Sequence, residues 1–214
     1  MNGARGFTLI ELLIAITLLG LLMAMLTGGL RLGTRAWDVG ETRLANTARL
    51  QAAQDFIRRS MTQAHPTRLE DDDEEEEALA FMGESESLSF VTLMPPQFAA
   101  AGFAWLTFAT ADNEADGIDL VVDWREFDPD ADDFAGEAEP RRSVLLPNVA
   151  AVAFDYYGDP EQDGDDPQWE TYWEPGPRLP DLVRMAVTFP DGDERLWPDL
   201  LIAPLIDARP TARR

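Results

Sequence analysis

Residues 7–30 read FTLIELLIAITLLGLLMAMLTGGL, and Glu11 is the only ionisable side chain in this stretch. A helix rises about 1.5 Å per residue, so the stretch is roughly 36 Å long and can cross a hydrocarbon core of about 30 Å. The length and apolar composition of this stretch therefore predict a transmembrane helix over residues 7–30. A carboxylate near the bilayer centre costs about 2.5–3.5 kcal/mol, so the position of Glu11 requires an explanation.

Three interpretations of this N-terminus compete. A cleaved secretory signal has a basic start, an apolar stretch and a small-residue cleavage site. Arg5 supplies the basic start, but no clear Ala-x-Ala site follows the apolar stretch. A plain membrane anchor accounts for the length but not for Glu11, because a charged side chain persists inside a bilayer mostly where it has a partner. The third interpretation uses the residues around Gly6 together with Glu11.

Residues 5–15, RGFTLIELLIA, resemble the N-terminal signature of type IV pilin-like proteins. In that family a membrane-embedded prepilin peptidase cuts after the glycine and methylates the new N-terminal residue. The resemblance implies a leader of residues 1–6, cleavage between Gly6 and Phe7, and N-methylation of Phe7. Glu11 would then be the fifth residue of the mature chain. Its carboxylate can neutralise the α-amino cation of a neighbouring subunit in the apolar interior of an assembly.

The helical pattern continues beyond the span. Residues 31–64 contain no proline, and apolar residues recur at three-, four- and seven-residue steps between arginines. Pro66 ends the pattern, because the residue before a proline is pushed out of helical geometry. We expect an amphipathic helix over residues 31–65 that lies on a domain and is nearly continuous with the span. His65, the single histidine, is interpreted as a cation at the helix C-terminus rather than a base or metal ligand.

From Leu79 onward the pattern alternates between apolar and polar residues, which predicts β-strands. Pro190-Asp191-Gly192-Asp193 is typical of a hairpin turn, and Pro198 favours an edge position for the last strand. These features predict an α+β, pilin-like fold. A long N-terminal helix packs on antiparallel β-sheets, and residues 66–214 form a β-rich globular domain with acidic loops. The expected strands cover residues 87–93, 118–124, 144–146, 149–157, 182–189 and 195–202.

The C-terminal half carries a second resemblance, to minor pseudopilin J of type II secretion systems. The resemblance implies a non-enzymatic subunit of the pseudopilus tip, with I-, K- and H-type subunits as partners. It also implies a single span in the bacterial inner membrane, with the domain in the periplasm. The alternatives are a minor pilin of a type IV pilus and a membrane-tethered calcium-binding or carbohydrate-active domain. The residues that carry the resemblance are Leu145-Leu146-Pro147-Asn148-Val149, Phe154-Asp155-Tyr156-Tyr157, Trp169, Trp173, Leu179-Pro180 and the strand to Phe189.

The charge of the chain limits the classes of molecule that it can bind. Its 214 residues contain 40 Asp and Glu against 17 Lys and Arg, for a net charge of -23, and no cysteine. Nucleic acid is excluded as a partner, because binding it requires a cationic face. Only Arg5 and Glu11 precede Arg31, so the acidity belongs to the domain beyond the span. The eight consecutive carboxylates of residues 70–77 are interpreted as a solvated surface loop.

Two acidic stretches have the spacing of a calcium loop, with carboxylates at alternate positions and a later one near the twelfth. Such spacings also arise by chance in a chain this acidic, and the flanking residues favour strands rather than helices. We therefore expect no cofactor, with calcium as the alternative. Motifs of hydrolases, zinc proteases and phosphate-binding loops are missing from the sequence, which disfavours an enzyme. The candidate ligands are Asp159, Glu161, Asp163, Asp165 and Glu170 in one stretch and Asp112, Glu114, Asp116 and Asp123 in the other.

Overall fold

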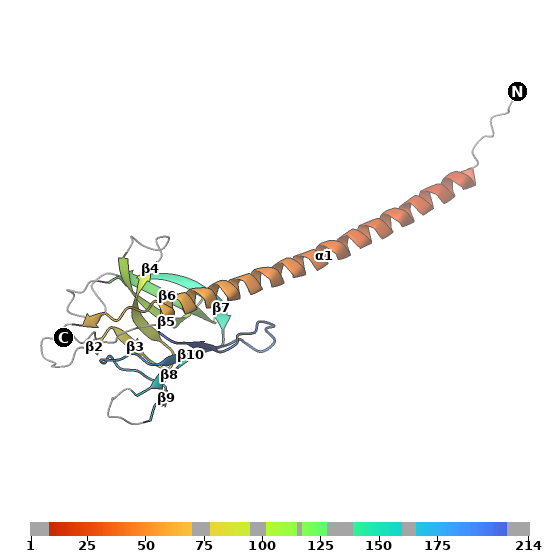
Figure 1. The fold of residues 1–214 in the computed structure, drawn as a ribbon. Helices are drawn as coiled ribbons and strands as arrows, with labels where there is room; N and C mark the ends of the chain where they lie inside the picture. Colours follow the sequence, from red (N-terminus) through yellow and green to blue (C-terminus); the bar gives the residue numbers. More distant parts are fainter. Residues whose placement is uncertain are drawn as a thin grey trace. The chain divides into compact units, whose positions relative to one another are not determined.

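A computed structural model describes residues 9–69, 78–94, 102–114, 117–127, 139–159 and 166–204. Met1–Thr47 and Ala48–Arg214 form two compact units. A single α-helix, α1 (Leu9–Thr62), runs through both of them (Figure 1). The expected near-continuity of the span with the following amphipathic helix is thus confirmed over these residues.

The last turns of α1 pack on the domain, as the amphipathic pattern predicts. Ala53, Ile57 and Met61 recur on one face and are buried. The hydroxyl of Thr92 lies 3.1 Å from the carbonyls of Ser60 and Gln63, and so satisfies acceptors that the helix end leaves open. The sheet therefore holds the helix by both apolar and polar contacts.

The larger of the two main sheets has five antiparallel strands in the order β3-β4-β5-β6-β7. The smaller has four antiparallel strands in the order β11-β10-β8-β9. Two short strands, β1 (Arg68–Leu69) and β2 (Ala78–Leu79), form a separate antiparallel sheet of their own. The larger sheet contains β3 (Phe81–Gly83), β4 (Leu88–Met94), β5 (Gly102–Asp112), β6 (Ile118–Glu126) and β7 (Arg141–Val149). The smaller contains β8 (Ala151–Gly158), β9 (Gln168–Glu170), β10 (Leu182–Thr188) and β11 (Leu200–Ile202).

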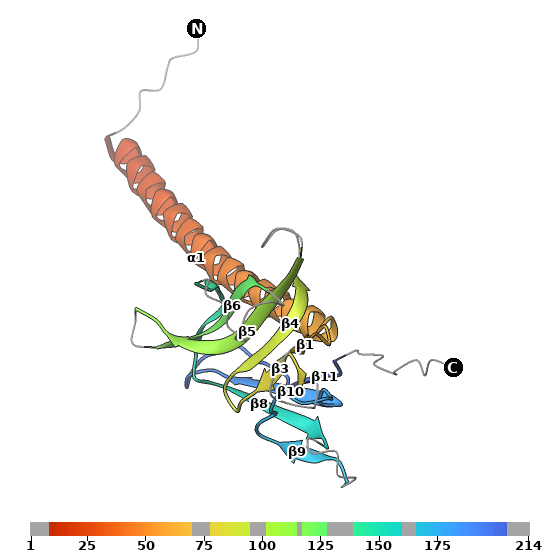
Figure 2. The same cartoon turned by 90° about the vertical axis from the view of Figure 1, so that its left-hand side faces the viewer.

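One apolar core joins the end of α1 to the inner faces of both sheets. It includes Ile57 from the helix, Phe108 from the larger sheet and Met185 from the smaller, each fully buried. Figures 1 and 2 both show β8, β9 and β10 as a layer distinct from β4, β5 and β6. The expected α+β class, with antiparallel sheets behind a long helix, is confirmed.

Two strands show where the sequence predictions and the structure differ. Strand β5 was not predicted, because apolar side chains lie on both of its faces and no two-residue alternation is visible. Phe108 on one face enters the main core, whereas Trp105 on the other packs with Ala80 and Val91. The last strand was predicted from residue 195 but begins at Leu200. Arg195 is instead bound to Asp193 and to two backbone carbonyls.

Candidate functional site

The first candidate site is the N-terminal half of α1. Leu9–Gly28 is long and apolar enough to cross a membrane, and none of this segment is buried within the protein. Its large apolar side chains are exposed by 51–83% on all sides of the helix, from Leu9 to Leu26. A helix that is apolar all round is typical of a lipid or assembly environment rather than of a water-exposed surface.

The two threonine hydroxyls of this segment form hydrogen bonds to carbonyls of the same helix. The hydroxyl of Thr17 donates to the carbonyl of Ile14 at 2.9 Å, and that of Thr27 donates to the carbonyl of Met23 at 2.7 Å. Such bonds leave no hydroxyl proton to be satisfied by lipid. Glu11 is exposed in the first turn of the helix, where the helix dipole favours a carboxylate. The predicted cleavage residues Gly6 and Phe7 lie outside the described residues.

The second candidate feature is the junction between the two sheets, which Tyr156 occupies. Its side chain is fully buried, and its ring meets that of Phe81 edge-on with centroids 6.3 Å apart. The hydroxyl lies 2.9 Å from the carbonyl of Glu84 and 3.2 Å from that of Ser87. A side chain of the smaller sheet therefore binds the β3–β4 turn of the larger one.

Glycine is required on the facing strand for this packing. A side chain at Gly83 would overlap the ring of Tyr156, so only glycine fits there. Gly83 also exchanges two backbone hydrogen bonds of 2.8 Å with Trp173. Trp173 is buried against Gly158 and donates its indole N–H to the carbonyl of Arg178. The aromatic-x-Tyr element and the tryptophan-bearing insert thus meet at one junction.

The first calcium candidate lies in the connection between β8 and β9. Asp159 and Glu170 are described, whereas Glu161, Asp163 and Asp165 lie outside the described residues. The register pairs Glu170 with Tyr156, which is three residues before Asp159 and about 10 Å from it along the strand. The flanks are strands, as the sequence indicates. Calcium binding in this loop stays a prediction.

The second calcium candidate is spread along the β5–β6 hairpin. Asp112 pairs with Ile118 near the hairpin end, and Asp123 lies five residues further along β6, about 17 Å away. Asp123 instead accepts two hydrogen bonds of 2.7 Å from Arg142. Glu114 is exposed, and Asp116 lies outside the described residues. The described part of the chain contains no cluster of three His, Cys, Asp or Glu residues that could hold a metal ion.

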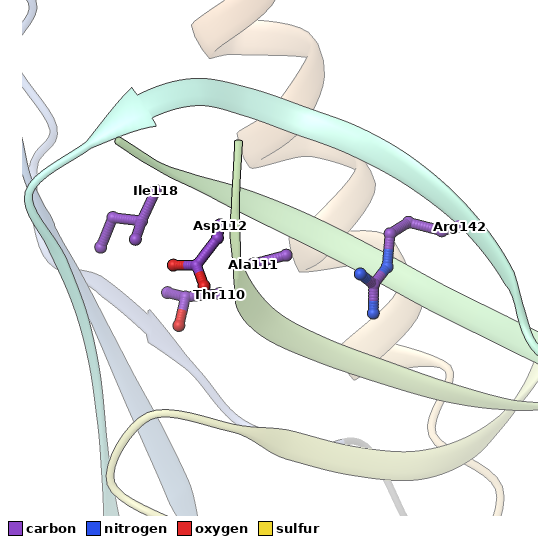
Figure 3. A pocket seen from close by; sticks show the side chains of 5 residues that line it. All are labelled: Thr110, Ala111, Asp112, Ile118 and Arg142. Carbon is purple, nitrogen blue, oxygen red and sulfur yellow. The ribbon is translucent and has the colours of Figure 1, made fainter. Parts of the chain in front are cut away.

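An open hollow of about 420 Å³ lies beside this hairpin. Figure 3 shows Ile118, Asp112 and Thr110 on one side of it and Arg142 on the other, with Ala111 between them. Because Arg142 is already bound to Asp123, its charge is largely satisfied within the sheet. The hollow therefore has no strong feature that would select a ligand.

His65 has structural contacts. Its ring contacts that of Phe103 at an interplanar angle of 60°, with centroids 4.4 Å apart, and Nδ1 lies 3.2 Å from the hydroxyl of Thr67. Its backbone N–H donates to the carbonyl of Val91 at 2.7 Å. These contacts connect the end of the helix to the larger sheet, and none of them involves a carboxylate or a second histidine.

An exposed apolar N-terminal helix that continues into an α+β domain with antiparallel sheets defines a pilin-like membrane protein. Family comparisons support this class. The model of the prokaryotic N-terminal methylation motif matches residues 1–27, and that of type II secretion system (T2SS), protein J matches residues 28–195. The chain is also 29% identical over 203 residues to type II secretion system protein J of Xanthomonas campestris pv. campestris, covering 94% of this chain and 92% of that protein.

The chain belongs to the type II secretion system protein J family. It is a minor pseudopilin of the type II secretion system, a membrane-anchored pseudopilus component of the kind that prepilin peptidase processes. The family match favours this assignment over the minor pilins of type IV pili. The two family models that match the chain are those of the two families that its sequence resembles.

Proposed function

We propose that the chain is a subunit of the pseudopilus tip, where it joins the I-, K- and H-type minor pseudopilins and supports protein export across the outer membrane. The role is structural rather than enzymatic. The observation that carries the proposal is the apolar segment Leu9–Gly28 of α1, which is exposed on all sides and contains one carboxylate, Glu11. A surface of this kind is stable only in lipid or against similar helices.

In this proposal, processing by prepilin peptidase supplies a cation that can face the carboxylate of Glu11 on a neighbouring subunit. Cleavage between Gly6 and Phe7 creates an α-amino cation, which N-methylation retains. Glu11 is four residues beyond Phe7, about 6 Å along a helix axis. A neighbouring helix offset by roughly one turn therefore brings its N-terminal cation level with this carboxylate. Pairing the two charges offsets part of their desolvation cost, which would be unopposed for either charge alone in an apolar environment.

The orientation is part of the proposal. The acidic domain after residue 30 is taken as the exported part, in keeping with the family to which the chain belongs. We place the span in the bacterial inner membrane and the domain in the periplasm. The net charge of -23 keeps this domain soluble there and repels like-charged surfaces.

Co-purification of the full-length chain with the I-, K- and H-type subunits in mild detergent tests the proposal. We expect Glu11→Gln to lose most of the co-purifying subunits while its leader is still removed. Glu41→Gln is the matched control, because Glu41 is exposed on the same helix beyond the span. Mass spectrometry of Gly6→Ala tests the cleavage site separately, since the leader should then be retained. Normal assembly of Glu11→Gln would refute the charge-pairing role.

A further inference from the structure

The first part of β7 is an open sheet edge. β7 is the last strand of the larger sheet, and its partner within the described residues is β6 alone. Apart from that pairing, the backbone of residues 141–146 forms no hydrogen bond with any described residue. In an antiparallel pair, alternate residues direct their N–H and C=O groups away from the partner strand. Residues 141–146 therefore present several backbone donors and acceptors to which another strand can bind.

The later part of the same edge is protected. Pro147 has no backbone N–H, and its carbonyl accepts a hydrogen bond of 2.8 Å from Arg195. The carbonyl of Asn148 accepts a second one of 2.7 Å from the same guanidinium. Proline and charged side chains are the usual means by which proteins block an exposed edge. The contrast limits the open edge to residues 141–146.

A groove of about 510 Å³ lies between this open edge and the end of α1. Ser143 and Val144 both line it, although they pair with consecutive residues of β6 and so direct their side chains to opposite faces of the sheet. The edge of β7, including its backbone, therefore forms one wall of the groove. The other wall is the helix, with Ala52 and Phe56 between Arg49 and Arg59.

The charged side chains that line the groove are cations. The described lining residues include Arg49 and Arg59 and no carboxylate, in a chain with 40 acidic and 17 basic residues. Both arginines are exposed, and neither forms an ion pair with a described residue. Nε of Arg59 donates to the carbonyl of Asp55 at 3.0 Å, which holds the guanidinium against the helix. The groove therefore favours a partner that carries carboxylates.

These features together define the chemistry of the occupant. A strand that adds to a free edge gains affinity from backbone hydrogen bonds and specificity from its alternate side chains. An apolar side chain flanked by carboxylates matches Phe56 and the two arginines. The open edge of a second copy does not fit, because it begins Arg141-Arg142 and brings cations instead. An open edge is also an aggregation hazard unless it is covered, which favours a permanent neighbour over a protein that is present only during export.

We propose that a neighbouring pseudopilus subunit adds an extended acidic segment to residues 141–146 of β7, as a further strand of the larger sheet. An apolar side chain of this segment packs on Phe56, and its carboxylates pair with Arg49 and Arg59. This inference rests on the proposed function and adds the surface and the chemistry of the contact.

Amide hydrogen exchange of the full-length chain tests the addition of a strand. The chain in mild detergent is compared by itself and after co-purification with the I-, K- and H-type subunits. We expect exchange in peptides that cover residues 141–146 to slow about tenfold in the complex. Peptides that cover β11, the edge strand of the smaller sheet, serve as the control and should be unchanged. Unchanged exchange over residues 141–146 in a complex that contains the other subunits overturns the proposal.

Photocrosslinking in the native membrane identifies the occupant. A photoreactive amino acid replaces Val144, or Leu201 on β11 as a control of similar exposure. The probe at position 144 should link to a peptide of another pseudopilus subunit that contains Asp or Glu beside an apolar residue, and the probe at position 201 should not. Arg49→Glu combined with Arg59→Glu should lower the yield about tenfold. Arg58→Glu is the matched charge control, because Arg58 is exposed on the same helix but does not line the groove.

Filling the groove provides an independent measurement. Ala52→Trp should lower the crosslink yield, because Ala52 is exposed and lines the groove, whereas Ala48→Trp lies on the same helix outside it and should not. A crosslink from position 144 to the chain itself, to a second copy, to lipid or to a basic peptide overturns the proposal. Co-purification of the I-, K- and H-type subunits is measured in the same samples. Their retention without the crosslink refutes this interface alone, whereas their absence from the wild-type sample refutes the tip assignment as well.

Discussion

Replacing Tyr156 by phenylalanine separates the two ways in which this residue joins the sheets. The ring is fully buried and remains in the variant, so its contact with Phe81 is kept. What is lost is the hydroxyl, which lies within hydrogen-bond distance of two carbonyls of the β3–β4 turn. The variant therefore measures the polar contact alone.

The expected loss is about 1–1.5 kcal/mol of unfolding free energy. A single hydroxyl proton donates one full hydrogen bond, and a typical one contributes about 0.5–1.5 kcal/mol net. The carbonyl of Ser87 already accepts the backbone N–H of Glu84, so only the carbonyl of Glu84 loses its partner. Glu84 is exposed, and water can replace the hydroxyl there. Tyr156→Ala should cost about 3–5 kcal/mol, because it also removes the buried ring.

The assay is thermal unfolding of the full-length chain in mild detergent, with near-ultraviolet circular dichroism as the signal. For a domain of this size 1 kcal/mol corresponds to roughly 2–4 °C in Tm, so Tyr156→Phe should lower Tm by about 2–6 °C. Tyr157→Phe is the control, because Tyr157 is only half-buried and lies on the face of β8 opposite to Tyr156. A loss for Tyr156→Phe as large as that for Tyr156→Ala would refute the reasoning, since packing would then contribute nothing.

The same residue predicts a pH dependence. Burial, reinforced by the charges of Glu84 and Asp155, raises the pKa of Tyr156 above its usual value. The native state therefore retains this proton after the unfolded chain has lost it, above a pH of about 10. Stability is fully present below that pH and falls as the pH rises further. The Tyr156→Phe variant should lack this contribution to alkaline destabilisation, and identical alkaline unfolding of both proteins would contradict it.

Three further changes test other parts of the structure. Gly83→Ala should destabilise the domain by about 1–3 kcal/mol, because the added methyl group overlaps the Tyr156 ring, whereas Gly176→Ala has room and should be near neutral in the same melting assay. Asp193→Asn should cost about 1 kcal/mol at neutral pH. The hydrogen bond from Arg195 lowers the pKa of Asp193, so its contribution is present above a pH of about 4 and is lost as the pH falls through the native pKa. A constant difference between wild type and Asp193→Asn at all pH values would contradict this. Isothermal titration of the full-length chain with millimolar calcium tests the acidic loops, and heat that disappears in Asp163→Asn would assign calcium to the β8–β9 connection.

The strands that sequence reasoning located best are those with one clean apolar face. Strand β6 is an example, with Leu120, Val122 and Trp124 directed into the core. Strand β5 was missed because its second face packs with a separate small cluster, which removes the alternation. The helix was predicted to end at residue 65 because Pro66 constrains the residue before it, and α1 ends three residues earlier, at Thr62.

The tertiary structure changed the meaning of several predicted site residues. Sequence spacing alone grouped Asp112 with Asp123 as possible ligands of one metal ion. The hairpin register separates the two residues, and Asp123 forms an ion pair with Arg142 instead. In the opposite direction, Gly83 and Tyr156 are 73 positions apart, and no local pattern connects them. Their contact exists only because the β3–β4 turn lies beside β8, where the backbone N–H of Phe154 donates to the carbonyl of Ser85.

The sequence by itself determined the membrane span, the pilin-like N-terminus, the long helix and the α+β class. These properties depend on local composition, periodicity and motif order, which involve residues that are close together in the sequence. Only the tertiary structure decided which glycine faces Tyr156 and which carboxylates stay together. Those properties depend on strand register and sheet packing, where one residue of shift moves every side chain to the opposite face.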